Sequence, residues 1–347
     1  MAEMTLQALG WGPFFQQQLT LEEYEFLCPV RVVQQHRDHL VVCGEALDLD
    51  VPIHHNMPPM TVGDWLLLDS ERRFQRCLER KSLFIRKAAG TRVQTQYIAA
   101  NVDTAFLVCS LNQDFNLNRI ERYLALVNEA GCEPVVVLTK ADLAEDAQLF
   151  VEQVRTLDPL LQVESLNATA AEEVLRLKAW CRTGSTVVFL GSSGVGKSTL
   201  ANSLLGHSAQ DTGEIRLDDG KGRHTTTGRS LLVLPDGGLL LDTPGMRELQ
   251  LADVEEGLEK TFADIVELAR GCRFSDCQHD SEPGCAVVEA VVDGTLDERR
   301  LHNYRKLMRE QAQNSATLAE KRARDKSLGK YYKRVQGQSR QQKKGHD

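Results

Sequence analysis

The sequence lacks a long hydrophobic run, and it lacks the even number of cysteines that a complete disulfide framework needs. No stretch approaches the ~18 apolar residues that span a bilayer, and the first residues, MAEMTLQALGWGPFFQQQL, do not place a basic run before an apolar core. The nine cysteines are odd in number. We therefore expect a cytoplasmic protein without a membrane span or a disulfide framework. Six cysteines lie scattered in apolar or strand-like stretches, namely Cys28, Cys43, Cys77, Cys109, Cys132 and Cys181.

Positive charge is in deficit overall, yet it is concentrated in two places. The formal net charge is -8, but residues 72–92 hold eight Arg or Lys against one Glu, and residues 319–347 hold ten against three acids. Two basic segments on an acidic body favour a polyanionic partner such as RNA, although isolated charge runs are also common on ordinary solvated surfaces.

The length of 347 residues predicts more than one domain. Residues 29–95 consist of short alternating stretches separated by Gly, Asp, Asn and Pro, which is typical of a small all-β barrel. We expect five parts: an N-terminal extension (1–28), the barrel (29–95), a nucleotide-binding domain (96–250), a helical domain (251–320) and a basic tail (321–347).

The nucleotide-binding domain reads as a doubly wound α/β domain, because apolar strands alternate with stretches of helical spacing. The expected strands are 102–109, 134–138, 186–190 and 239–241, and the expected helices are 119–127, 151–157 and 170–180. Beyond it, the composition predicts helices at 254–269 and 296–313. The tail has too little apolar surface to fold alone.

A phosphate-binding loop is predicted at residues 191–199, GSSGVGKST. It follows an apolar strand and opens a helix, and its glycines let backbone N–H groups approach phosphate oxygens. Lys197 would pair with the β- and γ-phosphates, and Ser198 would ligate Mg²⁺. The expected nucleotide-binding residues of this motif are Gly191, Ser192, Ser193, Gly194, Val195, Gly196, Lys197, Ser198 and Thr199.

A guanine-reading signature, Thr139-Lys140-Ala141-Asp142, lies upstream of this loop. The Asp142 carboxylate can accept two hydrogen bonds from guanine that adenine does not offer. Ordinary GTPases carry the two motifs in the opposite order, so the order predicts a circularly permuted GTPase domain. Asn167 and Ala168 could add a backbone contact to guanine, or could form a plain loop.

Asp242-Thr243-Pro244-Gly245 follows a third strand, from which Asp242 can reach the Mg²⁺ shell and Gly245 the γ-phosphate. The alternative is a simple Pro-Gly turn. Between this motif and the phosphate loop lies GRHTTT at 222–227, in a polar segment long enough to suggest a switch. The residue after DTPG is Met246, which cannot orient water. His224 is therefore the candidate catalytic residue, with an inert loop histidine as the alternative.

Cys272, Cys277, His279 and Cys285 form the pattern C-x4-C-x-H-x5-C. Three thiolates and one imidazole suit tetrahedral Zn²⁺, and four protein ligands leave no open position for a substrate. The sequence therefore predicts one structural zinc ion.

With these motifs together, the chain resembles the circularly permuted ribosome-biogenesis GTPases known as RsgA or YjeQ. The resemblance rests on Asn101-Val102-Asp103, on the order TKAD, GSSGVGKST, GRHTTT and DTPGMRE, and on the Cys3His cluster. It implies an N-terminal OB-fold barrel, the permuted P-loop GTPase domain and a C-terminal zinc domain. It further implies GTP hydrolysis with Mg²⁺, stimulated by the small (30S) ribosomal subunit during its late maturation.

By position, the resemblance implies a hydrolytic role for His224 and a Mg²⁺ contact from Thr225 or Thr226. It implies the small ribosomal subunit, its 16S rRNA and GTP/GDP as partners, and we expect a monomer. Asn167-Ala168-Thr169 replaces the more usual Ser-Ala pair of the family. Two other interpretations stay open: an RNA-binding scaffold whose nucleotide site is vestigial, and an ATP-dependent P-loop enzyme.

Overall fold

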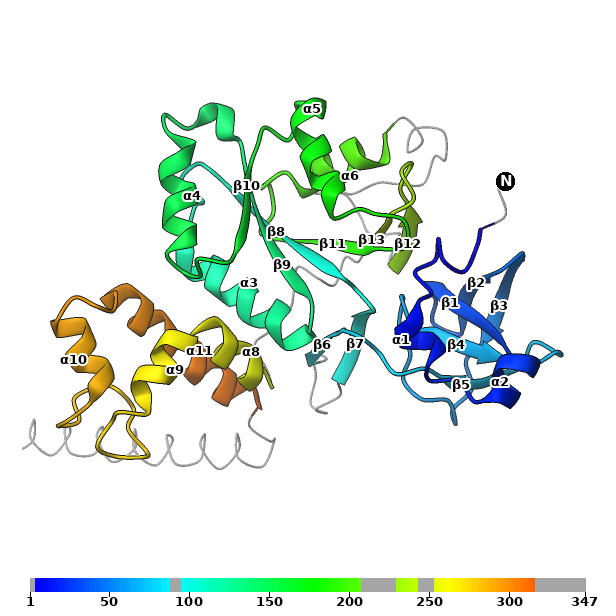
Figure 1. The fold of residues 1–347 in the computed structure, drawn as a ribbon, viewed down its shortest axis with the longest axis horizontal. Coiled ribbons are helices and arrows are strands. Elements are labelled where there is room, and N and C mark those ends of the chain that lie inside the picture. Colours follow the sequence, from blue (N-terminus) through cyan, green and yellow to red (C-terminus); the bar gives the residue numbers. More distant parts are fainter. Residues whose placement is uncertain (1–3, 88–94, 207–228, 243–252, 316–347) are drawn as a thin grey trace, which may run out of the picture.

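The computed structural model describes residues 4–87, 95–206, 229–242 and 253–315 (Figure 1). The helices and strands form a barrel-side unit, a central α/β unit and a C-terminal helical unit. The central unit lies between the other two. None of the helices in the described ranges combines the length and the hydropathy that a bilayer span requires.

The central unit is built on a mostly parallel sheet. Its strands run in the order β10-β9-β8-β11-β13-β12, and only the pairing of β12 with β13 is antiparallel. Their bounds are β8 Thr104–Ser110, β9 Glu133–Thr139, β10 Gln162–Ser165, β11 Thr186–Leu190, β12 Arg229–Val233 and β13 Leu239–Asp242. Parallel strands buried on both faces read as apolar runs, which explains why the sequence located four of them closely.

Helices cover both faces of this sheet. Strand β8 shows why: Phe106 and Val108 point into one hydrophobic cluster, whereas Leu107 and Cys109 point into the other. The first cluster contains α5 (Ala171–Val174), the 3₁₀ helix η2 (Leu175–Ala179) and α6 (Lys197–Leu205). The second contains α3 (Leu117–Ala130) and α4 (Ala147–Arg155).

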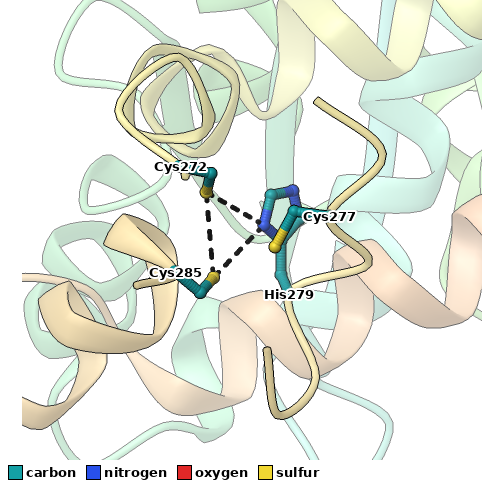
Figure 2. A group of neighbouring side chains, drawn as sticks. All are labelled: Cys272, Cys277, His279 and Cys285. Carbon is teal, nitrogen blue, oxygen red and sulfur yellow. Dashed lines mark hydrogen bonds between the residues drawn. The ribbon is translucent and has the colours of Figure 1, made fainter. Parts of the chain in front are cut away.

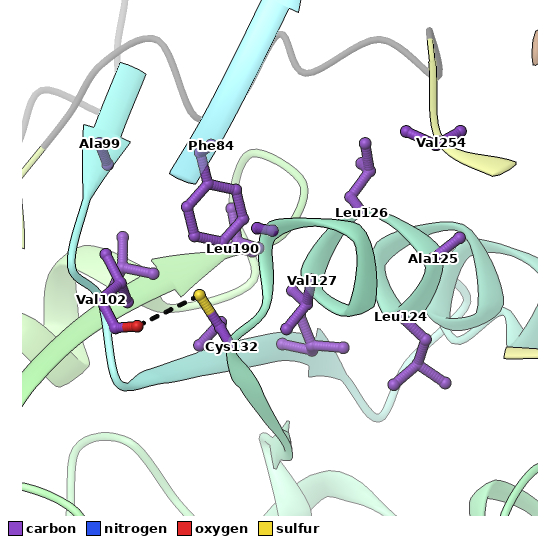
Figure 3. Close-up of a cluster of buried hydrophobic side chains, with 14 of the residues drawn as sticks. Phe84, Ala99, Val102, Leu124, Ala125, Leu126, Val127, Cys132, Leu190 and Val254 are labelled. Atoms are coloured by element: carbon purple, nitrogen blue, oxygen red, sulfur yellow. Dashed lines mark hydrogen bonds between the residues drawn. The ribbon is translucent and has the colours of Figure 1, made fainter. Parts of the chain in front are cut away.

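Helix α3 has clear end signals. The Asn116 side chain accepts a hydrogen bond from the Arg119 N–H at 3.2 Å, and Gly131 ends the helix with a φ of +78°. Its buried side packs against β8, β9 and β6 (Leu83–Lys87), and β6 pairs with β7 (Thr95–Ala100). Phe84 of β6 lies near Leu126 and Val127 in Figure 3.

The barrel-side unit consists of antiparallel strands: β1 (Cys28–Gln35) pairs with both β2 (His39–Gly44) and β4 (Trp65–Leu68), while β2 also pairs with β3 (Leu47–Pro52) and β4 with β5 (Phe74–Cys77). The N-terminal residues add two short helices, α1 (Pro13–Gln16) and α2 (Leu21–Phe26). Phe15 packs on the fully buried Trp65. The N-terminal residues therefore contribute to the hydrophobic core of the barrel-side unit.

The helical unit contains α8 (Glu255–Thr261), α9 (Ala263–Ala269), α10 (Ala286–Val292) and α11 (Glu298–Ser315). The single helix predicted at 254–269 is wrong, because Phe262 interrupts it with a φ of -114° and a ψ of 39°. Phe262 is completely buried and packs against Tyr304. A tertiary contact thus overrides the helical periodicity.

The predicted helix at 170–180 is likewise α5 followed by the 3₁₀ helix η2. The hairpin β6–β7 forms a two-stranded sheet of its own, and residue 95, where we placed the end of the barrel, is the first residue of β7.

Candidate nucleotide site and metal site

The predicted nucleotide-binding residues gather at one edge of the central sheet. Strands β9, β11 and β13 end at Thr139, Leu190 and Asp242, and they run parallel in one sheet. Their carboxyl ends therefore share an edge, where α/β proteins bind ligands.

The phosphate loop has the backbone conformation that its glycines predict. Gly191, Gly194 and Gly196 have φ values of +149°, +78° and +100°. A Cβ at Gly191 would lie 2.3 Å from the Val108 carbonyl oxygen, so glycine is required there. A Cβ at Gly194 would meet nothing within 4 Å, so this part of the loop borders open space.

Helix α6 begins directly after Gly196, with Lys197 and Ser198 in its first turn. Lys197 is 8% exposed, and its ammonium donates a hydrogen bond to the Ser192 carbonyl within the loop. The positive charge therefore lies inside the loop, at a helix N-terminus, where phosphates are favoured. Thr199 is exposed and Val195 is buried in the same segment.

The segment Thr139-Lys140-Ala141-Asp142 contacts this loop although more than fifty residues separate them. The buried Thr139 hydroxyl donates to the Val195 carbonyl at 2.6 Å. The Lys140 ammonium donates to the Gly194 carbonyl at 3.2 Å, and Lys140 adopts a left-handed φ of +58°. The two motifs are therefore in contact, as the predicted permutation requires.

Asp142 lies exposed in the 3₁₀ helix η1 (Ala141–Leu143). Next to it, the segment of Asn167 and Ala168 follows β10, and the Leu166 carbonyl accepts from the Ala141 N–H at 3.4 Å. The Asn167 carboxamide oxygen accepts from the Thr169 N–H at 2.9 Å, which holds the loop in a tight turn. Ala168 is buried, with its methyl group 3.7 Å from the position of a Cβ on Gly196.

Arg119 is a neighbour of the phosphate loop that sequence reasoning missed. Its guanidinium donates to the Ser192 hydroxyl at 2.9 Å and to the Asp114 carboxylate at 2.6 Å. Hydrogen bonding to Asp114 raises the pKa of Arg119. Ser192 lies 73 positions further along the chain, and no local pattern links the two residues.

The remaining predicted site residues divide in two. Asp242 is the last residue of β13 and is partly buried at the same edge of the sheet. His224, Thr225, Thr226 and Gly245 lie outside the described residues.

The four predicted zinc ligands come together in the helical unit (Figure 2). Their ligand atoms all lie within 4.8 Å of one another. The sulfurs of Cys272 and Cys285 are 3.8 Å apart, and each lies within 3.6 Å of His279 Nδ1. A tetrahedron with Zn–S bonds of ~2.3 Å has edges of about this length. The donor set therefore fits Zn²⁺.

The surroundings favour the protonation state that zinc requires at two of the four ligands, His279 and Cys272, whereas burial raises the pKa of Cys277 to about 11. Burial lowers the pKa of His279, so its ring is neutral at physiological pH. Burial opposes ionisation of Cys272, but hydrogen bonds from the backbone N–H groups of Val287 and Ala286, together with those from the thiols of Cys285 and Cys277, lower the pKa of this thiol. These amides belong to the first turn of α10, where a helix favours negative charge.

The basic segment at 72–92 is less free than its charge suggests. Arg76 pairs with Glu23 of α2 at 2.6 Å, and Arg80 pairs with the fully buried Asp64 at 2.6 Å. These two arginines stabilise the barrel-side unit. Arg72 is exposed in the turn between β4 and β5.

Comparisons with known proteins agree with this geometry. A family model described as RsgA GTPase matches residues 77–252. A protein of Vibrio vulnificus named Small ribosomal subunit biogenesis GTPase RsgA 2 is 58% identical, covering 96% of this chain and 95% of that protein. A protein of Mesorhizobium japonicum named Small ribosomal subunit biogenesis GTPase RsgA is 48% identical, covering 90% of this chain and 91% of its own.

Solved structures show the same fold. The crystal structure of YjeQ from Thermotoga maritima superposes with a TM-score of 0.62 at 27% identity, over 82% of this chain and 98% of that one. YloQ, described as a circularly permuted GTPase, gives a TM-score of 0.57 at 24% identity, over 86% of this chain and all of its own. The order of motifs, their convergence on one edge of the sheet and these matches lead to one conclusion: the chain belongs to the RsgA GTPase family.

Proposed function

We propose that this protein binds GTP with Mg²⁺ at the edge formed by β9, β11 and β13, hydrolyses it, and couples the cycle to late maturation of the small ribosomal subunit. The hydrogen bond of 2.6 Å from Thr139 to Val195 carries the proposal, because it joins the guanine-reading segment to the phosphate loop. The names of the relatives, small ribosomal subunit biogenesis GTPases, supply the partner.

The residues of the site have distinct roles in this proposal. Asp142 accepts hydrogen bonds from guanine, and Asn167 and Ala168 add backbone contacts. The loop from Gly191 to Thr199 binds the phosphates, with Lys197 between the β- and γ-groups. Ser198 and Asp242 hold Mg²⁺, which neutralises charge that develops on the phosphates.

Hydrolysis needs a group that orients water. We propose His224 for this role, Thr225 or Thr226 for a further Mg²⁺ contact, and Gly245 for the γ-phosphate. Because Met246 stands where Ras-like enzymes carry a glutamine, hydrolysis by the free protein should be slow. Binding of the subunit then stimulates it by completing the site.

The flanking units serve the partner. We propose that the barrel (29–95) is an OB-fold that contacts 16S rRNA, that the basic tail (321–347) adds salt-dependent attraction, and that the helical domain (251–320) holds one structural Zn²⁺. The protein acts as a cytoplasmic monomer.

Phosphate release measured with and without purified small subunits tests this function. We expect the protein alone to release phosphate from GTP slowly and the rate to rise steeply when subunits are added. With GTP and ATP both supplied, the product should be GDP rather than ADP. Equal rates with and without subunits would contradict the coupling. No hydrolysis under either condition would favour a scaffold with a vestigial site, and a preference for ATP would favour the ATP-dependent alternative.

Asp142→Asn tests the base contact. An amide keeps one acceptor oxygen but presents an NH2 donor where the second carboxylate oxygen was, so it cannot accept both guanine hydrogen bonds. GTP affinity should therefore fall by roughly two orders of magnitude while xanthosine triphosphate binding improves. Glu145→Gln is the matched control, because Glu145 is an exposed acid of the same loop. Equal effects of the two variants would remove Asp142 from the site.

A further inference from the structure

Helix α3 touches the phosphate loop on one side. Arg119 donates to the Ser192 hydroxyl at 2.9 Å, and Asp114, which precedes the helix, fixes the same guanidinium at 2.6 Å. A small pocket lined by Tyr123, Val195 and these three residues lies beside the contact. The loop is therefore not close-packed on α3 here, and the hydrogen bond from Arg119 to Ser192 joins the two.

The opposite side of α3 holds the helical unit. Residues two positions apart on a helix point about 200° apart, so Arg119 and Glu121 face opposite directions. Glu121 is completely buried, accepting from Arg300 at 2.8 Å and from Arg299 at 3.0 Å. One turn further, a Cβ on Gly257 of α8 would lie 2.0 Å from the Ala125 carbonyl oxygen, so the two helices are in backbone contact.

This helix is thus a continuous element of 14 residues whose first turns touch both the phosphate loop and the zinc-bearing unit. A close-packed helix with a buried charge network moves as one body. Helix α3 therefore connects the loop at Ser192 with α8 and α11 through contacts on a single helix.

We propose that Arg119 is a positioning residue, which fixes the phosphate loop to α3 through Ser192 and thereby couples nucleotide occupancy to the zinc-bearing helical unit. The proposal rests on the assignment of residues 191–199 as the nucleotide-binding loop. Arg119 acts through Ser192, so it affects GTP and GDP alike and does not act on the γ-phosphate alone.

Nucleotide binding by Arg119→Met tests the positioning role. Loss of a charge-assisted hydrogen bond should raise the KM for GTP, and the Kd values for GTP and GDP, by about tenfold while kcat changes by less than about twofold. Arg119→Lys should recover most of the affinity, because it keeps the charge. Arg155→Met, at an exposed position at the end of α4, is the matched control and should bind as the wild type does.

Amide hydrogen exchange tests the coupling. With every variant saturated by GDP, protection of α8 and α11 should increase in the wild type and in Arg155→Met, but not in Arg119→Met. Protection of α6 should increase in all three, which shows that nucleotide is bound.

Unchanged affinity of Arg119→Met, a loss of kcat without a change in KM, or retained protection of α8 and α11 would each overturn the inference. The absence of a protection change in these helices of the wild type would do the same. If the wild type binds neither GTP nor GDP, the proposed function itself fails, so the two failures can be distinguished.

Discussion

The central α/β unit contacts the helical unit at one interface and the barrel-side unit at another, and these two joints are built differently. On the helical side, the buried charges are matched: Glu121 lies between Arg299 and Arg300, and Arg300 also pairs with Asp264 at 2.7 Å. On the barrel side, Arg229 donates to the neutral oxygens of Gln35 and Thr61 at 2.9 and 3.3 Å.

The strand pairing at the barrel joint is also short. Strands β1 and β12 share two pairs of residues, Gln34 with Ser230 and Gln35 with Arg229. Burial lowers the pKa of Arg229, and the nearby positive charge of Arg86 adds to the effect. Within the part of the chain that the structure describes, Arg229 donates only to neutral oxygens, and we expect such an arginine to stabilise its interface less than the matched charges of the helical side do. We therefore expect the barrel to separate from the central unit more easily than the helical unit does.

The zinc site gives the largest expected effect on the helical side. Structural zinc sites have apparent binding free energies of the order of 10 kcal/mol, so Cys285→Ser should abolish zinc binding and remove amide protection from α9 and α10. Metal analysis should find one zinc per chain in the wild type and in the control Cys181→Ser, whose thiol is buried in the central unit. Full zinc content in Cys285→Ser would disprove the site.

Arg300→Met should give the next largest effect. The change leaves the buried Glu121 and the Asp264 carboxylate without a partner that bridges them, which should lower the opening free energy of α11 by about 3 kcal/mol. Arg122→Met is the matched control, because Arg122 also joins α3 to α11, through Glu310, but both side chains are about 30% exposed. The control should cost under about 1 kcal/mol. Native-state hydrogen exchange measures both.

Arg229→Met should lower the opening free energy by less than Arg300→Met does, because Arg229 donates to neutral oxygens whereas Arg300 pairs with carboxylates. Loss of its hydrogen bonds to neutral oxygens should lower the opening free energy of the β1 and β12 amides by about 1–2 kcal/mol. Arg182→Met, at an exposed arginine of the central unit, controls for loss of charge. A cost equal to that of Arg300→Met would show that the two joints are alike after all.

The sequence located the central unit well because its signals are local. Apolar runs predicted β8, β9, β11 and β13 to within about two residues, and the glycine pattern predicted the phosphate loop. The order of the two motifs predicted a circularly permuted domain, and the hydrogen bond from Thr139 to Val195 shows that the two motifs are in contact. The convergence of Cys272, Cys277, His279 and Cys285 was predicted from their spacing, and the structure brings the four side chains together.

Contacts between distant segments were not predictable in the same way. Nothing near Phe262 in the sequence indicates that packing against Tyr304 would end a helix there. The basic segment was read as a surface for RNA, yet Arg76 and Arg80 have carboxylate partners 53 and 16 positions away. Charge counts reveal composition but not pairing, so the sequence overstated the free positive charge of the barrel.

Acid titration of the Glu23–Arg76 pair gives the smallest expected effect and sharpens the account of the barrel. The hydrogen bond from Arg76 lowers the pKa of Glu23 from 4.5 to about 2. A carboxyl whose pKa is lower in the folded state contributes stability above its unfolded pKa, and this contribution disappears as the pH falls through the folded value. The stability difference between wild type and Glu23→Gln should therefore be constant above about pH 5 and shrink between about pH 4.5 and pH 2. Urea unfolding across this range measures it, with Glu22→Gln on the exposed side of α2 as the control. A difference that stays constant down to pH 2 would mean that α2 is not held to β5 by this ion pair, and that the apolar contacts of the N-terminal extension with Trp65 suffice.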